Sequence, residues 1–366
     1  MRRKLKIATF VTSEIPFPIP KDFPRPYAPL QVALNIAEGL SKRGHQITFF
    51  GPKGSKSKKF KVIRGNFNPL YKNEILKLPS VGTGEREKIF NLFDQNCIAL
   101  LFKENLKRKF DLIHIHPVDR ALPFGFLFKT PIVYTLHDPI YRWRKKIFEL
   151  YQTKNQYFIA ISKFQKRAAP NLNWAGVVYN GIDLKKFPFE KKVGKYCLFF
   201  GRIMEKKGVH EAILAAKLAK EKLIIIGDCQ NKKYLRKKIK PYLGKNTKCL
   251  EFLPYQKIPQ YVARAKVSLM PIKWNEPFGL VFIESMACGT PVIAFDRGSA
   301  QEVVKDGKTG FVVKNVNEMV KAIKKINQID RRECRKHVEK NFSIGKMVER
   351  YEKIFLKISK RNSSRN

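Results

Sequence analysis

One stretch, residues 271–312, restricts the fold of this chain more than any other. It follows an apolar run at 267–270, crosses a loop that contains Pro277 and Gly279, and enters a segment with apolar residues at helical spacing. It then turns at 289–291 into a second apolar run, 292–295. This order of strand, loop, helix, turn and strand predicts an α/β protein.

The loop in this stretch has the composition of an anion site. Gly and Pro residues lead into a helix start, where backbone N–H groups are unpaired and aligned with the positive end of the helix dipole. Two carboxylates flank it, Glu276 before the turn and Glu284 eight residues later. Carboxylates repel phosphate, so we expect both to accept hydrogen bonds from sugar or ribose hydroxyls. The structural alternatives are a helix-start acid for Glu276 and a solvated residue for Glu284, although a free charge among apolar neighbours is costly.

The residues E-P-F-G-L-x-x-x-E-x-M-A-x-G-x-P-V-I-A, read from Glu276, resemble the E-x7-E signature of the retaining family-4 glycosyltransferases. The resemblance implies a GT-B fold, in which two Rossmann-like doubly wound α/β domains face a central cleft. It implies that Glu276 approaches the donor sugar and that Glu284 holds the nucleotide ribose. Phe278, Gly279 and Leu280, between the two acids, then belong to the donor-binding residues.

Composition limits the partners and the compartment. The 366 residues suit two domains, and 74 Lys and Arg against 30 Asp and Glu give a net charge of +44 that is spread over both halves. This charge favours acidic partners: nucleotide donors, anionic lipid and, without specificity, nucleic acid. The alternative is that the lysines only cover solvated faces. Six scattered cysteines without a C-x-x-C pair fit a reducing cytoplasm.

Membrane attachment is expected to be peripheral at most. The N-terminus has too few apolar residues for a signal peptide and is interpreted as a first strand, and no run reaches the roughly 18 apolar residues that span a bilayer. We therefore expect a cytoplasmic protein, with contact at the inner face of the membrane left open. The basic helical segment 85–110 is either a lipid-surface helix or an exposed basic helix. The basic segment 140–152 is an acceptor patch, a lipid-surface patch or an exposed basic helix.

The first half begins as a βαβ unit. Residues 5–11 and 45–50 predict strands, 30–44 predict a helix, and the proline-rich segment 15–29 predicts a loop at the carboxyl end of the first strand, where open α/β sheets bind ligands. Within that loop, Tyr27-Ala28-Pro29-Leu30-Gln31 stands where the family has Y-G-G-x-E. Neither glycine is present, so the close backbone approach to phosphate that glycine permits is not expected.

Two later strands, 111–117 and 131–138, each end near a histidine. A histidine at the carboxyl end of a parallel strand projects toward the ligand-binding edge, and two at equivalent ends favour a functional interpretation over a structural one. His116 and His137 resemble family positions that contact the donor sugar or the acceptor. His114 is expected to face the core.

A second α/β set begins at 196. Arg202 and Lys207 flank a short loop between the strand ending at Gly201 and a helix at 209–219, and two cations beside a helix start can neutralise a diphosphate. Family members carry an Arg and a Lys at this spacing. The expected division is an acceptor-binding domain at 1–188, on which a C-terminal helix at 342–360 packs, and a donor-binding domain at 189–341.

These observations lead to one functional hypothesis and its rivals. The resemblance implies a retaining glycosyltransferase that moves a sugar from a nucleotide-diphosphate donor, with a UDP-sugar favoured, to a glycan, lipid-linked or small-molecule acceptor. The expected catalytic residues are His116, His137, Arg202, Lys207 and Glu276. The sequence has no Asp-x-Asp motif, and no metal or other cofactor is expected.

The rivals are a GT-B relative with other chemistry, an epimerase or a phosphorylase, and a basic nucleic-acid-binding protein. The unfocused charge and the lack of zinc-finger spacing weigh against specific nucleic-acid binding.

Overall fold

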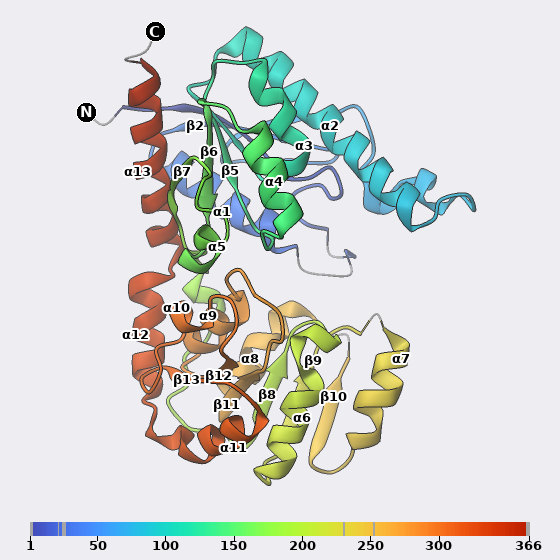
Figure 1. Ribbon diagram of the computed structural model, residues 1–366, viewed down its shortest axis with the longest axis vertical. Coiled ribbons are helices and arrows are strands. Elements are labelled where there is room, and N and C mark those ends of the chain that lie inside the picture. The colour runs from blue at the N-terminus through green and yellow to red at the C-terminus, as the bar shows by residue number, and fades with distance from the viewer. Residues whose placement is uncertain (1–2, 21, 24–26, 230, 252, 364–366) are drawn as a thin grey trace. The chain divides into compact units, whose positions relative to one another are not determined.

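The chain divides into two compact units in the computed structural model, which describes residues 3–20, 22–23, 27–229, 231–251 and 253–363 (Figure 1). The first unit comprises Met1–Ile161, Lys166–Val178 and Met347–Asn366, and the second comprises Ser162–Gln165 and Tyr179–Lys346. Part of the predicted proline-rich loop, at 21 and 24–26, lies outside the described residues.

The first unit is built on a seven-stranded parallel sheet with the order β3-β2-β1-β4-β5-β6-β7. Its strands are β1 (Lys6–Phe10), β2 (Gln46–Gly51), β3 (Lys61–Arg64), β4 (Leu112–Ile115), β5 (Ile132–Thr135), β6 (Gln156–Ala160) and β7 (Trp174–Val177). Every residue of β4, β5 and β6 is buried, because helices cover both faces of such a sheet. These strands are therefore continuous apolar runs.

Helices of the first unit bury apolar residues against this sheet. Phe10, Ile113, Tyr134 and Phe158 belong to one buried cluster, and burying each such side chain stabilises the fold by about 1.5–3 kcal/mol. The helices are α1 (Ala28–Lys42), α2 (Thr83–Arg108), α3 (Val118–Ala121), α4 (Arg142–Tyr151) and α5 (Lys163–Arg167), with the 3-10 turns η1 (Leu70–Lys72), η2 (Glu74–Lys77) and η3 (Leu122–Phe126).

The last helix, α13 (Ile344–Ser363), packs on the first unit. The hydroxyls of Tyr351 and Thr135 are 3.0 Å apart, and Glu352 pairs with Arg43 at 2.6 Å. The C-terminal helix, expected at 342–360, continues as far as Ser363. Tyr351 and Phe355 are buried on the apolar face of this helix, and the helical conformation that they hold continues through the polar residues 359–363.

The second unit repeats the design with a six-stranded parallel sheet, order β10-β9-β8-β11-β12-β13. Its strands are β8 (Cys197–Phe200), β9 (Leu223–Ile226), β10 (Thr247–Leu250), β11 (Val267–Met270), β12 (Val292–Phe295) and β13 (Gly310–Val313). Its helices are α6 (Val209–Leu218), α7 (Lys232–Tyr234), α8 (Ile258–Ala263), α9 (Leu280–Ala287), α10 (Ala300–Val303), α11 (Val316–Lys325) and α12 (Arg331–Asn341), with turns η4 (Leu184–Lys186), η5 (Glu205–Lys207), η6 (Leu235–Ile239), η7 (Lys240–Tyr242), η8 (Tyr255–Lys257) and η9 (Ile326–Gln328).

Both sheets therefore have the doubly wound Rossmann strand order that the sequence predicted. In each, the first strand of the unit lies beside the fourth, so that the order reverses between β1 and β4 and between β8 and β11. The connections on either side of such a switch point lead away in opposite directions, and ligands bind at the carboxyl ends of the strands there. The fold thus marks two edges for functional side chains.

The sequence of residues 158–166 predicts a strand, but β6 ends at Ala160 and α5 begins at Lys163. Ser162 caps the turn, because its hydroxyl accepts a hydrogen bond from the N–H of Gln165 at 3.0 Å. The apolar residues 158–161 favour a strand and give no sign of the Ser162 cap that follows them.

Helix α12 is held by a buried arginine. Arg331 is 4% exposed and donates to the carbonyls of Glu190, Ala263 and Ala265 and to the hydroxyl of Thr290, at 2.6–2.9 Å. One guanidinium therefore satisfies four acceptors from three segments of the second unit.

Arg331→Ala is expected to destabilise the protein by about 2–4 kcal/mol, because it leaves these buried acceptors without a donor. Urea denaturation measures the loss. Arg332→Ala, which alters the exposed neighbour on the same helix, is the matched control and should change stability by less than about 0.5 kcal/mol. Equal urea midpoints for the two variants would show that the hydrogen bonds of Arg331 do not stabilise the protein.

Candidate active site

The loop after β8 and the loop after β11 meet at the switch point of the second sheet. Lys273 N–H donates to the carbonyl of Lys206 at 2.9 Å, and the ammonium groups of Lys206 and Lys207 lie 4.7 and 5.2 Å from the centre of the Trp274 ring. The indole face attracts these cations through its ring quadrupole. Backbone and side-chain contacts thus join the two loops.

Lys207 and Glu276 form an ion pair at this edge. Their side-chain atoms are 2.5 Å apart, with 17% and 13% of the side chains exposed. A mostly buried pair of this kind is screened by water and salt less than a fully exposed pair. Two of the predicted site residues, one from each loop, are therefore brought into contact.

Glu276 is positioned by the segment that follows β12. The amide of Ser299 donates to the carbonyl of Glu276 at 3.0 Å, and the Ser299 hydroxyl donates to the carbonyl of Phe278 at 2.8 Å. Gly298 has φ +60°, and a Cβ there would lie 2.2 Å from the Glu276 carbonyl oxygen. Only glycine allows this approach.

Arg202 follows β8 through Gly201, whose φ of +135° also requires glycine. Its exposed side chain lines a cavity of about 610 Å³ together with Ile203, Met204, Asp228, Asn231 and Lys232. In the described part of the chain this lining contains two cations and one acid, and Lys207 is not part of it. The structure therefore assigns Arg202 to the cavity and Lys207 to the pair with Glu276.

Helix α9 begins at this edge. Gly279 lies at its N-cap with φ +78°, where the first helical amides have no intrahelical acceptor, and Leu280 is the first helical residue. Phe278 is 2% exposed, and its ring packs against those of Tyr179 and Phe342 at 6.1 and 5.8 Å. The buried ring anchors the turn that presents these amides.

Glu284 lies one helical turn further along α9 and is buried. Its carboxylate accepts a hydrogen bond from the Tyr255 hydroxyl at 2.5 Å. Burial raises the pKa of Glu284 to about 7, while the Tyr255 hydrogen bond acts in the opposite direction. The interpretation of Glu284 as a solvated residue is therefore wrong.

In the first unit, His116 and His137 lie together beyond the ends of β4 and β5. Nδ1 of His116 is 2.7 Å from Nε2 of His137, and the rings are stacked. Burial lowers the pKa of His137 to about 4 and holds that of His116 well below its usual value, so both rings are neutral at pH 7. Among the described residues, Nε2 of His116 is buried without a hydrogen-bond partner.

His114 is a core residue, as predicted. It is 1% exposed, contacts the Thr135 hydroxyl at 2.9 Å and packs against Tyr351 and Phe355 of α13. Burial lowers its pKa to about 3.

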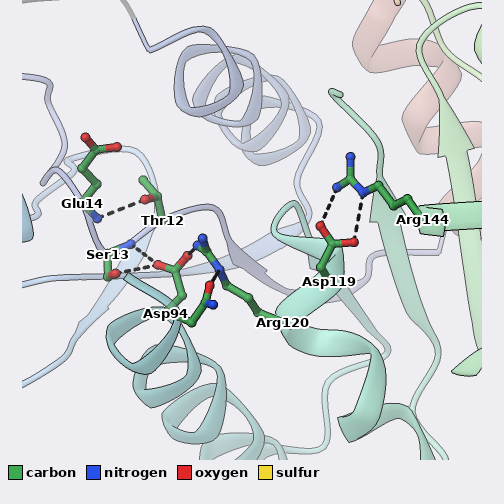
Figure 2. Close-up of polar contacts among 8 residues, drawn as sticks. Thr12, Ser13, Glu14, Asp94, Asp119, Arg120 and Arg144 are labelled. Carbon is green, nitrogen blue, oxygen red and sulfur yellow. Dashed lines mark hydrogen bonds and ion pairs between the residues drawn. The ribbon is translucent and has the colours of Figure 1, made fainter. Parts of the chain in front are cut away.

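Figure 2 shows a polar network at the carboxyl end of β1 that sequence reasoning missed. Asp94 of α2 is 1% exposed and accepts from the amide and hydroxyl of Ser13 at 2.7 and 2.5 Å and from the guanidinium of Arg120. The amide of Glu14 donates to the Thr12 hydroxyl at 3.0 Å. The network fixes the loop of residues 12–14 beside the first switch point.

Tyr27, from the segment compared with the family's glycine loop, stands at the N-cap position of α1, and Pro29 lies in the first turn. The phenol of Tyr27 is hydrogen-bonded to Thr12, and burial raises the pKa of this phenol. This segment therefore begins a helix beside the loop of residues 12–14.

The described residues contain no group of three or more His, Cys, Asp or Glu arranged to hold a metal ion. In the same part of the chain, none of the helices has the length and apolar character needed to cross a bilayer.

Comparison with known proteins identifies the class. The sequence model of Glycosyltransferase Family 4 matches residues 31–186, and that of Glycosyl transferases group 1 matches residues 182–342. A relative in Bacillus subtilis (strain 168), named "Putative glycosyltransferase YtcC", is 29% identical over 338 residues, which are 78% of this chain and 82% of the relative. The glycosyltransferase MJ1178 of Methanocaldococcus jannaschii, itself uncharacterised, is 29% identical over 68% of this chain and 76% of its own.

Solved structures agree on the fold. Sucrose-phosphate synthase from Thermosynechococcus elongatus superposes with a TM-score of 0.77 at 19% identity, covering 97% of this chain and 99% of that one. The Anabaena protein HepE in complex with UDP-glucose gives 0.66 at 20% identity, covering 98% and 100%. The protein is thus a glycosyltransferase with the GT-B fold. It belongs to family 4.

Gly298→Ala is expected to lower transferase activity tenfold or more, because the new methyl group displaces the backbone of Glu276. Gly307→Ala is the matched control: Gly307 has φ +70° but no heavy atom within 4 Å of the position that the new methyl group would take, so the change adds backbone strain alone. Initial rates and melting temperatures of both variants check this. Equal activity in the two variants would show that Gly298 does not position Glu276.

The stability of the Glu284→Gln variant, compared with that of wild type, is expected to increase as pH rises. The native pKa of about 7 lies above the ordinary 4.5, so the wild-type contribution from Glu284 is present below pH 4.5 and is lost as pH rises to about 7. Urea denaturation at pH 5 and pH 8 measures the difference between the variant and wild type, with exposed Glu251→Gln as the control. A difference that is the same at both pH values would contradict the buried, proton-binding Glu284.

Proposed function

We propose that this glycosyltransferase moves a sugar from a nucleotide-diphosphate donor to an acceptor with retention of configuration. The observation that carries the proposal is the pairing of Lys207 with Glu276 at the switch point of the second sheet, beside the start of α9. A cation, helix amides and an acid gathered at one edge provide for a diphosphate and for a hydroxyl-bearing sugar. The named UDP-glucose complex of HepE supports a UDP-sugar as the donor.

Leaving-group stabilisation is the largest contribution that such a site can make. We assign it to Arg202, Lys207 and the amides at Gly279 and Leu280. Arg202 presents a planar fork that matches two phosphate oxygens, whereas Lys207 is a point charge. In this proposal the bond between the anomeric carbon and the diphosphate oxygen breaks, and these donors stabilise the charge that develops on the diphosphate.

The acids and histidines are assigned to hydroxyl groups. Tyr255 occupies one oxygen of Glu284, so the other is proposed to accept from a ribose hydroxyl, and Glu276 is proposed to accept from the donor sugar. His116 and His137 are neutral and hydrogen-bonded to each other, which leaves one ring nitrogen on each, one a donor and the other an acceptor, for a sugar or acceptor hydroxyl. The acceptor oxygen attacks the face that the diphosphate leaves, and the leaving phosphate takes its proton.

The proposal requires no metal and no other cofactor. It includes an acceptor that is a glycan, a lipid-linked sugar or a small molecule, and a cytoplasmic enzyme with peripheral contact to anionic membrane. The direct test incubates the protein with UDP-, GDP- or ADP-glucose and an acceptor, follows nucleotide release, and determines the product's anomeric configuration by NMR. Inverted product would contradict retention, and conversion of the donor without any acceptor would instead indicate an epimerase.

Arg202→Ala and Glu276→Gln are each expected to lower kcat/KM by about 10² or more while leaving the melting temperature within a few degrees of wild type. Each change removes a group proposed to interact with the donor in the transition state. Arg236→Ala, which removes an exposed arginine from η6, is the matched control and should be neutral. Normal turnover in either folded variant would remove that residue from the proposed site.

A further inference from the structure

Helix α4 has an unusual orientation: an arginine faces inward and a tryptophan outward. Arg144 and Phe148 are 8% and 0% exposed, whereas Trp143 and Leu150 are 61% and 69% exposed. The buried Phe148 is usual for a surface helix of a water-soluble domain, but such a helix usually exposes an arginine and buries a tryptophan and a leucine. The exposed face therefore needs an explanation beyond packing.

Specific contacts fix this orientation. The Arg144 guanidinium forms two hydrogen bonds to Asp119 of α3, at 3.0 and 2.8 Å (Figure 2). It also lies 5.2 Å from the centre of the Phe148 ring. A second carboxylate, Asp138, lies 3.6 Å away. Because a bidentate Arg–carboxylate pair is geometrically strict, it holds the rotation of α4 about its axis.

The exposed side chains form one stripe. Trp143, Ile147 and Leu150 follow at intervals of four and three residues, so they lie above one another on a single face. Lys146 and Arg142 border the stripe on one side at helical spacing, and both are exposed. The turn η3, which contacts α4, ends at the exposed Phe126, and the exposed Leu127 follows it.

We propose that this stripe of α4, defined by Trp143, Ile147 and Leu150, docks in the headgroup region of an anionic lipid bilayer. Interfacial helices combine a Trp- and Leu-bearing face with bordering Lys and Arg, which is the arrangement found here. The cations of Arg142 and Lys146 pair with lipid phosphates, while the indole and aliphatic groups enter the acyl boundary. The net charge of +44 adds a long-range attraction to the same surface.

The size of the stripe favours lipid over a protein partner. A ten-residue helix is about 15 Å long and about 10 Å wide. Its face thus covers a small part of the roughly 800 Å² that each partner buries in a standard protein interface. A bilayer needs no matching surface, and three apolar side chains with bordering cations suffice for reversible binding.

The inference rests on the membrane contact included in the proposed function and assigns it to α4. Its test uses neither donor nor acceptor, so its failure is distinguishable from a failure of the proposed sugar transfer. Full-length protein is sedimented with vesicles of phosphatidylcholine alone or with about one third phosphatidylglycerol, at 0.15 M and 1 M salt. At 1 M salt the Debye length is about 3 Å, so unspecific attraction by the high net charge is suppressed and apolar insertion remains. Wild type is expected to bind the anionic vesicles at 0.15 M salt and to retain part of that binding at 1 M.

The decisive variant is the double change Trp143→Ser/Leu150→Ser, which keeps every charge and should weaken vesicle binding tenfold or more. Its matched control is Leu92→Ser/Leu106→Ser, which removes two apolar side chains of α2 that are 65% and 68% exposed. The control should bind like wild type. Equal binding by both double variants would overturn the proposal.

A second measurement locates the indole. The fluorescence quenched by brominated lipids, compared between wild type and Trp143→Phe, isolates Trp143 from Trp174 and Trp274. Quenching of Trp143 is expected with anionic vesicles. If Trp143 is not quenched, the stripe does not enter the bilayer. If the protein self-associates in solution and the Trp143→Ser/Leu150→Ser variant does not, the stripe binds a second copy of the chain.

Discussion

The reversal of strand order in each sheet is the constraint on which the site depends. Parallel strands end at the same edge, and the connections leaving β8 and β11 lead to opposite faces of the sheet. No connecting segment crosses such a switch point, so the backbone groups at the carboxyl ends of its two strands are accessible to a ligand. This is why Lys207 and Glu276, 69 residues apart, lie 2.5 Å from each other. The first unit has the same reversal between β1 and β4, where Ser13 and His116 follow the strands.

Both edges hold a carboxylate that is neutralised by a cation from another segment. At the first edge, Asp94 is buried and accepts two hydrogen bonds from Ser13 as well as the ion pair with Arg120, so its charge is stabilised and it fixes the backbone of Ser13. At the second edge, Glu276 keeps part of its surface exposed and has Lys207 as its partner. The difference in burial separates an acid that supports a loop from one that remains partly exposed.

Sequence patterns predicted the elements better than the contacts between them. Apolar runs and helical spacing are local, so the strands, the main helices and the α/β class could be predicted from them. The residues at 276–284 were found because their order resembles a known signature. The partner of Glu284 is Tyr255, 29 residues away, and the residue that makes room for Glu276 is Gly298. Such pairs are set by strand order, which no local pattern contains. Arg331 was missed because an arginine in a charged helix gives no apolar signal, although its four acceptors bury it.

The short helix α3 connects two features of the first unit that are far apart in the sequence. Asp119 holds Arg144 and thereby the rotation of α4, while the adjacent Arg120 holds Asp94 and thereby the loop of residues 12–14 (Figure 2). Successive residues of a helix point about 100° apart, so one turn can pair an acid with one neighbour and a cation with another. A lysine at 144 could not make both hydrogen bonds to Asp119, and the outward direction of Trp143 would lose its geometric support. The exposed face of α4 and the loop at the end of β1 are therefore fixed by the same turn of helix.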